Sequence, residues 1–127
     1  MAASEGFYPH QAPIDAYGNG GFRFAEMSHR GSLLCLPSGM HAWDVTAAGA
    51  VTLESLGPVL ADADRLDVLL IGLGSEIVRL DPAIREALRA WQVIVEAIAT
   101  GGAVRTYNVL LAEHRAVGAA LIAVQNV

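Results

Sequence analysis

Two glycine-rich segments hold the residue types with which this sequence could bind an anion. Gly72-Leu73-Gly74-Ser75 follows a continuous apolar run, and Thr100-Gly101-Gly102 leads directly into a helical pattern that carries Arg105 one turn later. Glycines allow backbone amides to approach a ligand closely, and the first turn of a helix combines unpaired N–H groups with the positive end of the helix dipole. The two segments therefore predict a site for a small anionic ligand.

Both segments also have a structural explanation. The first fails the dinucleotide-binding fingerprint, which needs three glycines at a strand-to-helix turn, because Ile77 occupies the third position and the next helix begins only after Asp81-Pro82. In the second, Thr100 can cap the helix while Gly101 and Gly102 permit a tight turn. The structural explanation is the alternative to ligand binding, and the sequence favours it.

Complete catalytic and metal-binding patterns are absent from the sequence. A serine or cysteine nucleophile needs a base and an orienting partner, and no serine stands in a nucleophile elbow. Cys35 lies among leucines in a strand pattern, which predicts a buried, unreactive thiol. The histidines lack the paired spacing of metal ligands, and one cysteine cannot complete a zinc set. The sequence therefore favours a protein that is not an enzyme and predicts no catalytic residue, no metal and no cofactor.

Three large side chains have an expected place in the fold. Trp91 recurs with Ile84 and Leu88 at helical spacing, so we expect it on the buried face of a helix. His114 falls on the apolar side of the last helix, which predicts a core histidine bonded to the backbone. Trp43 stands beside an expected surface turn, and we predict it as a contact for a protein partner because tryptophan is enriched in such interfaces.

The second half of the chain alternates strand and helix patterns. We expect strands at 66–71, 93–95 and 117–124, with helices after residue 81 and at 100–114. This alternation is typical of crossover units on a parallel sheet. If the first two strands are parallel neighbours, both glycine segments open at one edge of the sheet, where open α/β sheets bind ligands.

The first half predicts antiparallel structure. Three short strands are expected in a meander at 22–24, 31–36 and 40–45, followed by a helix that begins near Thr52 unless Pro58 delays or kinks it. Residues 1–15 predict an extended N-terminal arm, and residues 16–127 one domain. The predicted fold class is α/β: a three-layer single domain whose mixed central sheet has a parallel second half and antiparallel N-terminal strands.

The composition argues against several classes of protein. Hydrophobic residues make up 54% of the 127 residues and charged residues 17%, which suits one domain with a sheet buried on both faces. The formal net charge is -5, and every basic side chain is an arginine standing apart from the others, so nothing predicts nucleic-acid binding. No apolar run reaches the ~18 residues of a membrane span, and the start carries no secretory pattern. We therefore expect a cytoplasmic protein with no nucleic-acid partner and no membrane insertion.

A set of ordered residues resembles one known family. The set comprises Gly31-Ser32, Trp43, Ile71-Gly72-x-Gly74, Thr100, Ala103, Thr106-Tyr107-Asn108-x-Leu110, Glu113, Arg115 and Ala119-Ala120-Leu121-Ile122. It is similar to a small domain-of-unknown-function family whose eukaryotic members include a mitochondrial assembly factor of respiratory complex I, over about residues 17–124. Relatives usually carry Gly-Thr-Gly where this chain has Gly72-Leu73-Gly74, and a small or acidic residue where it has His114.

The resemblance implies a three-layer α/β fold with a mixed central sheet and a role in protein assembly. The first hypothesis is accordingly a non-enzymatic interaction protein that uses an exposed apolar or aromatic patch, with respiratory complex subunits or other assembly proteins as partners. The second is a small anionic ligand-binding protein, or an unrecognised enzyme, that uses residues 72–75 and 100–102. The sequence leaves a homo-oligomer open.

Overall fold

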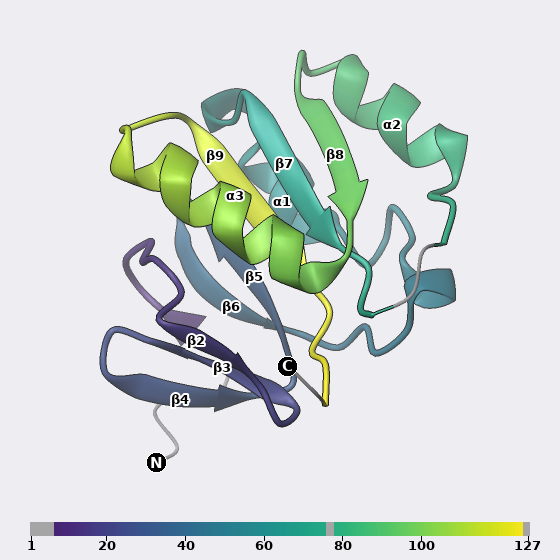
Figure 1. The fold of residues 1–127 in the computed structure, drawn as a ribbon. Helices are drawn as coiled ribbons and strands as arrows, with labels where there is room; N and C mark the ends of the chain where they lie inside the picture. Colours follow the sequence, from purple (N-terminus) through teal and green to yellow (C-terminus); the bar gives the residue numbers. More distant parts are fainter. Residues whose placement is uncertain (1–6, 76–77, 126–127) are drawn as a thin grey trace.

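A six-stranded mixed sheet forms the centre of the computed structural model, which describes residues 7–75 and 78–125 (Figure 1). The strand order is β1-β6-β5-β9-β7-β8, with β7 parallel to both β8 and β9, and β5 antiparallel to β9 and β6. The strands are β1 (Phe7–Tyr8), β5 (Ser32–Leu36), β6 (Gly39–Trp43), β7 (Val68–Gly72), β8 (Ile94–Ile98) and β9 (Val117–Leu121). The predicted fold class, a mixed sheet with a parallel second half, is confirmed.

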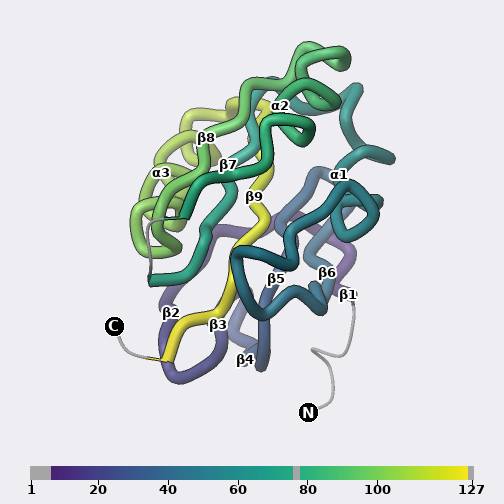
Figure 2. Tube along the Cα trace, turned by 90° about the vertical axis from the view of Figure 1, so that its right-hand side faces the viewer, coloured from purple at the N-terminus to yellow at the C-terminus, as the bar shows by residue number. Residues whose placement is uncertain are grey.

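Helices and a second sheet cover the two faces of the central sheet (Figures 1 and 2). One face packs against α1 (Gly57–Ala61), α2 (Pro82–Arg89) and two short 3-10 turns, η2 (Ala48–Ala50) and η3 (Ala63–Arg65). The other face packs against α3 (Thr100–Ala112) and a three-stranded antiparallel sheet of β2 (Ala16–Gly18), β3 (Gly21–Phe24) and β4 (Met27–Arg30). Each face has its own apolar core because side chains alternate along the buried strands.

The cysteine and the helix after Asp81 follow the sequence closely. Cys35 is fully buried on β5, and burial raises the pKa of its thiol, so the thiol stays protonated at neutral pH. The carboxylate of Asp81 accepts a hydrogen bond from the amide of Ala83 (2.9 Å) and caps α2, with Pro82 in the first turn. No helix in the described part of the chain is long and apolar enough to cross a membrane.

The N-terminal half departs from the predicted three-strand meander. It forms two sheets, because the β2–β4 strands pair only with one another while β5 and β6 join the central sheet. Gly31, with a φ of +94°, is where the chain passes from one sheet to the other, and this left-handed conformation suits glycine. The polar run Met27–Arg30 gave no strand pattern in the sequence, so β4 was not predicted.

Helix α1 begins at Gly57 rather than near Thr52. Pro58 has no amide to bond back along a helix that started at Thr52, and it fits only in the first turn. Residues 52–55 instead form a turn in which the amide of Ser55 donates to Thr52 Oγ1 (3.0 Å) and the amide of Thr52 donates to Ser55 Oγ (2.9 Å).

Two side chains expected in the core are exposed. α2 ends at Arg89, and the left-handed Gln92 turns the chain toward β8, so Trp91 lies beyond the helix and is 53% exposed. α3 ends at Ala112, and His114 follows it in a left-handed conformation (φ +61°) on the surface. Both predictions were wrong because each helix stops before the residue that the apolar spacing included.

The segment before β2 is fastened to α3. The hydroxyl of Tyr107 donates to the carbonyl of Ala12 (2.7 Å), and the Asn108 side chain both accepts from the amide of Ile14 (2.8 Å) and donates to its carbonyl (2.8 Å). The Gln11 side chain donates to the carbonyl of Val117 (2.7 Å). Residues 7–15 therefore lie along the domain; residues 1–6 of the expected arm, like Ile77, are outside the described residues.

Replacing Tyr107 by phenylalanine should lower the free energy of unfolding by about 1–2 kcal/mol, because the buried carbonyl of Ala12 then loses its donor. Urea unfolding measures the change. Tyr8→Phe is the matched control, since the Tyr8 hydroxyl makes no hydrogen bond within the described residues. Equal losses for the two variants would contradict a fastening role for Tyr107.

Candidate functional site

The structure brings the two glycine segments together at one edge of the sheet. β7 and β8 are parallel neighbours, so Gly72–Ser75 and Thr100–Gly102 both follow strand ends on the same side. The amide of Leu73 donates to the carbonyl of Ile98 (2.8 Å), and the amide of Thr100 donates to the carbonyl of Gly74 (2.9 Å). The segments thus bond to each other across this edge.

The side chain of Thr100 joins three strand ends. Its fully buried hydroxyl donates to the carbonyl of Ile122 (2.7 Å), just after β9, and accepts from the amide of Gly74 (3.0 Å), just after β7. Thr100 does not cap α3 as expected, because Ala99 holds the cap position and makes no side-chain cap bond. The hydroxyl is a structural tie, and both of its bonds are internal.

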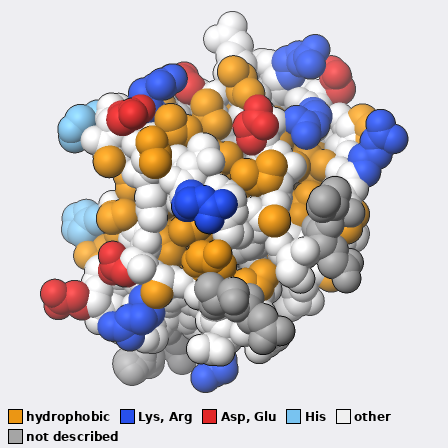
Figure 3. All heavy atoms as spheres, viewed as in Figure 1, with side chains coloured by type: hydrophobic (Ala, Val, Ile, Leu, Met, Phe, Trp, Pro, Cys, Tyr) orange, Lys and Arg blue, Asp and Glu red, His pale blue; other side chains and the backbone are white. Residues whose placement is uncertain are grey.

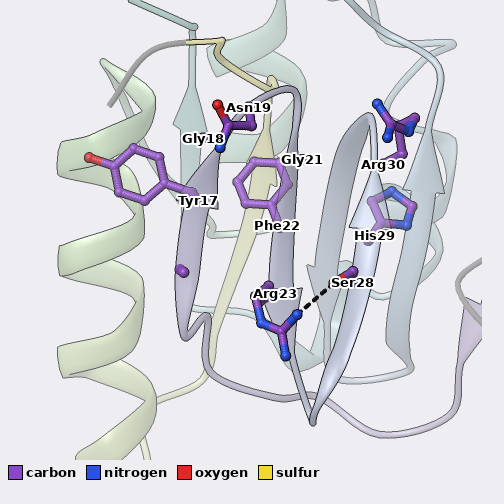
Figure 4. Close-up of a pocket in the computed structure, with 10 residues that line it drawn as sticks. Tyr17, Gly18, Asn19, Gly21, Phe22, Arg23, Ser28, His29 and Arg30 are labelled. Atoms are coloured by element: carbon purple, nitrogen blue, oxygen red, sulfur yellow. Dashed lines mark hydrogen bonds between the residues drawn. The ribbon is translucent and has the colours of Figure 1, made fainter.

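Glycine is required beside this tie for packing reasons. A Cβ at Gly72 would lie 2.9 Å from both Cα and Oγ1 of Thr100, and a Cβ at Gly101 would collide with the hydroxyl of Tyr17. Figure 4 shows the Tyr17 ring directed away from its own sheet toward the helix. The approach to the first turn of α3 is therefore occupied, while Ser75 and Arg105 remain exposed on either side of it.

A hollow of about 390 Å³ lies beside the glycine segments. It is lined by residues 46–48, 73–75 and 122–125, and none of these described residues carries a charged side chain. The lining therefore offers an anion only hydroxyl, amide and backbone donors, among them Thr46, Ser75 and Gln125, and no positive charge. No group of three or more His, Cys, Asp or Glu in residues 7–75 and 78–125 could hold a metal ion.

Trp43 is not at the surface as predicted. It is 5% exposed in the core beneath α1, and its indole N–H donates to the carbonyl of Ser55 (2.7 Å). Residues 52–56, which follow Trp43 in the sequence, pack against its indole ring. Trp43 also lines an open hollow of about 630 Å³, together with Asp44, Thr52, Glu54 and Pro58.

The outer face of the small sheet carries another hollow, of about 470 Å³ (Figure 4). Gly18 and Gly21 pair across β2 and β3 and contribute no side chain to the lining, whereas Arg30, opposite Gly21 on β4, does. Arg23 lies further along the same face and donates to the hydroxyl of Ser28 (2.7 Å). The absent side chains account for the hollow.

Exposed apolar side chains gather around β8. Seven large hydrophobic residues are exposed in the described chain. Three of them, Trp91 (53%), Ile94 (61%) and Ile98 (37%), come from β8 or the segment before it, and a fourth, Val78 (38%), lies in the connection between β7 and α2 and lines a hollow with Ala97 of β8. These four residues are called the β8 surface below. On the face drawn in Figure 3, which carries α3 and β8, hydrophobic side chains are exposed between single charged ones.

The position of β8 in the sheet explains this exposure. β8 is the last strand, and α3 packs mainly over its neighbours β7 and β9. Val95 and Ala97 face the core under α2, whereas Ile94 and Ile98 point to the opposite face, where α3 comes close only at Gly102, beside Ile98. Sequence reasoning missed these two isoleucines, although the charged Glu96 between them is typical of a face open to solvent.

Comparison with known protein families shows to which family this chain belongs. The model of a family described as protein of unknown function (DUF498/DUF598) matches residues 14–122. The chain belongs to this family. An uncharacterised protein of Rhodobacter capsulatus is 38% identical over 122 residues, which cover 96% of this chain and 93% of that protein.

The family also includes larger eukaryotic proteins. The mouse protein named NADH dehydrogenase [ubiquinone] 1 alpha subcomplex assembly factor 3 is 31% identical over 115 residues, which cover 91% of this chain and 62% of the mouse protein. The human protein of the same name is 30% identical over 109 residues. This chain therefore spans about three fifths of the length of these assembly factors.

Solved structures of similar sequence share the fold. A crystal structure described as an outer membrane protein from Bartonella henselae has a TM-score of 0.89 and 52% sequence identity to this chain. The match covers 93% of this chain and 99% of the Bartonella chain. A Mth938-like domain from Bordetella pertussis has a TM-score of 0.80 and 28% identity, and covers 91% of this chain and 88% of its own.

Replacing Thr100 by valine should lower the free energy of unfolding by about 2–4 kcal/mol, because the Gly74 amide and the Ile122 carbonyl would remain buried without a partner. Thr100→Ser keeps the hydroxyl and should lose about 1 kcal/mol or less, the contribution of one methyl group. Chemical denaturation of the three proteins measures both changes. A valine variant as stable as the serine variant would show that the tie does not hold the edge together.

Proposed function

We propose that this protein is a non-enzymatic assembly factor that acts in the cytoplasm and binds protein partners of respiratory complex I through the β8 surface. The assembly-factor relatives support the choice of partner, since their similarity covers most of this chain. The observation that carries the proposed mode of action is the exposed apolar group Val78, Trp91, Ile94 and Ile98. Exposed apolar groups of this kind mark protein interaction sites, and tryptophan is often a main contributor.

Ligand binding at the glycine segments has less support. An anion at the start of α3 would compete with Tyr17, which already covers Gly101, and the hydroxyl of Thr100 is bonded on both sides. The β8 surface, in contrast, is exposed without any rearrangement.

Affinity purification of the tagged full chain from its host, while the host assembles complex I, tests the proposal. We expect reproducible recovery of complex I subunits with the wild-type chain and a loss of about tenfold or more with Ile94→Asp, since a charge cannot be buried unpaired in an apolar contact. Leu53→Asp is the matched control, because Leu53 is an exposed apolar residue (37%) away from β8 and should leave recovery unchanged. Failure to recover complex I subunits, or equal recovery with Ile94→Asp, would contradict the proposal.

A further inference from the structure

The free side of β8 carries backbone groups that no strand covers. β8 is hydrogen-bonded to β7 on one side only: the amide of Ile94 donates to the carbonyl of Asp67 (2.9 Å), and the carbonyl of Ile98 accepts from Leu73 (2.8 Å). In a parallel pair, alternate residues bond to the same neighbour. The backbone groups of Val95 and Ala97 are therefore directed to the open side of the sheet.

Helix α2 covers part of this open side with a side chain. The amide of Val93, at the beginning of the strand, donates to the carbonyl of Leu88 (3.0 Å). The guanidinium of Arg85 donates to the carbonyl of Val95 (2.6 Å). A flexible arginine thus occupies the position in which the amide of an added strand would bond, and the amide of Val95 and both backbone groups of Ala97 are left along the edge.

Two hollows follow the same edge, and Arg85 lines both. One, of about 340 Å³, lies between Arg85, Arg89 and residues 92–96, and the other, of about 400 Å³, between residues 78–80, Pro82, Arg85 and Ala97. Together they form a groove along β8 that is interrupted only by the Arg85 side chain. The groove lies on the open side of the edge strand, where one more strand would pair.

The charge of this groove is opposite to the charge of the chain. Arg79, Arg85 and Arg89 line it and Glu96 is the one acidic residue in its lining, although the chain as a whole carries a formal net charge of -5. None of the three arginines forms an ion pair with a described carboxylate, since the ion pair found in the described part of the chain joins Arg65 and Asp62 elsewhere. Such a groove complements an acidic segment.

We propose that the β8 edge binds an extended acidic segment of a protein partner by β-strand addition. The segment pairs with the backbone of Val95 and Ala97, and Arg85 leaves the Val95 carbonyl to meet a carboxylate of the segment. Alternate side chains of the added strand face the arginines, and the others extend the apolar β8 surface. A second copy of this chain fits less well, because pairing two β8 edges would bring the arginines of one copy against those of the other. The inference rests on the proposed function and specifies how its surface binds.

Fluorescence anisotropy with two labelled peptides tests the inference on the full chain. One peptide alternates valine with glutamate, and the other alternates valine with lysine. We expect the acidic peptide to bind at least about tenfold more tightly than the basic one, and more weakly as salt is added. Equal affinities for the two peptides, or no binding of the acidic one, would overturn the inference.

Two sets of variants locate the binding. Ala97→Pro removes an amide that points away from β7, so it should leave the sheet intact and weaken acidic-peptide binding about tenfold. Ala97→Gly is the control, because it keeps the amide and should keep the affinity.

The double variant Arg79→Glu and Arg89→Glu should also weaken acidic-peptide binding about tenfold. The double variant Arg30→Glu and Arg115→Glu changes the net charge equally and should leave the affinity unchanged. Undiminished binding by the Arg79 and Arg89 double variant would overturn the inference even if Ala97→Pro does not fold. Self-association of the chain that Arg79→Glu and Arg89→Glu abolish would also overturn it, in favour of a second copy.

The two proposals can fail separately. If the peptides do not bind but Ile94→Asp still abolishes recovery of complex I subunits, strand addition is wrong and the proposed function stands. If the acidic peptide binds as expected but no complex I subunit is recovered, the edge is a binding site for another class of partner.

Discussion

The buried hydroxyl of Thr100 is the interaction on which the organisation of this domain depends. It connects the end of β7, the residue after β9 and the first turn of α3, and so closes the edge of the sheet where related architectures bind ligands. Gly72 and Gly101 follow from that closure, since each leaves room for a neighbour that is already present. The glycines that suggest a ligand site in the sequence therefore serve packing in the structure.

The glycine edge is closed, and exposed apolar side chains are found instead around β8, at the side of the sheet. β8 is the last strand of the central sheet, and α3 is centred on β7 and β9, so the face of β8 that carries Ile94 and Ile98 is only partly covered. The same strand has an open edge, which native proteins protect against uncontrolled pairing. Here the side chain of Arg85 covers part of that edge, and in the proposed mode of binding it moves away when the partner strand pairs. In this proposal, the edge of β8 is protected against uncontrolled pairing and still binds its partner strand.

Sequence patterns predicted what depends on local periodicity. The apolar run that became β7, the Asp81-Pro82 start of α2 and the alternation of strands and helices all follow from residue spacing, and they lead to the correct fold class. The thiol of Cys35 is buried as its leucine neighbours indicate. Patterns failed where tertiary contacts decide the outcome: Trp43 is covered by a turn near in sequence, and Trp91 is exposed because α2 ends two residues before it. The exposed face of β8 was missed, because the order of strands in a sheet is not encoded in the spacing of any one strand and Glu96 alone does not show which strand lies at the edge.

The central claim is that this domain acts through the side of the sheet at β8 and not through the closed glycine edge. Hydrogen exchange of the full chain, alone and bound to the complex I subunits that it captures, tests this claim directly. We predict that binding slows amide exchange in β8 and α2 and leaves residues 72–75 and 100–102 unchanged. Slower exchange at the two glycine segments, with β8 unaffected, would contradict the account.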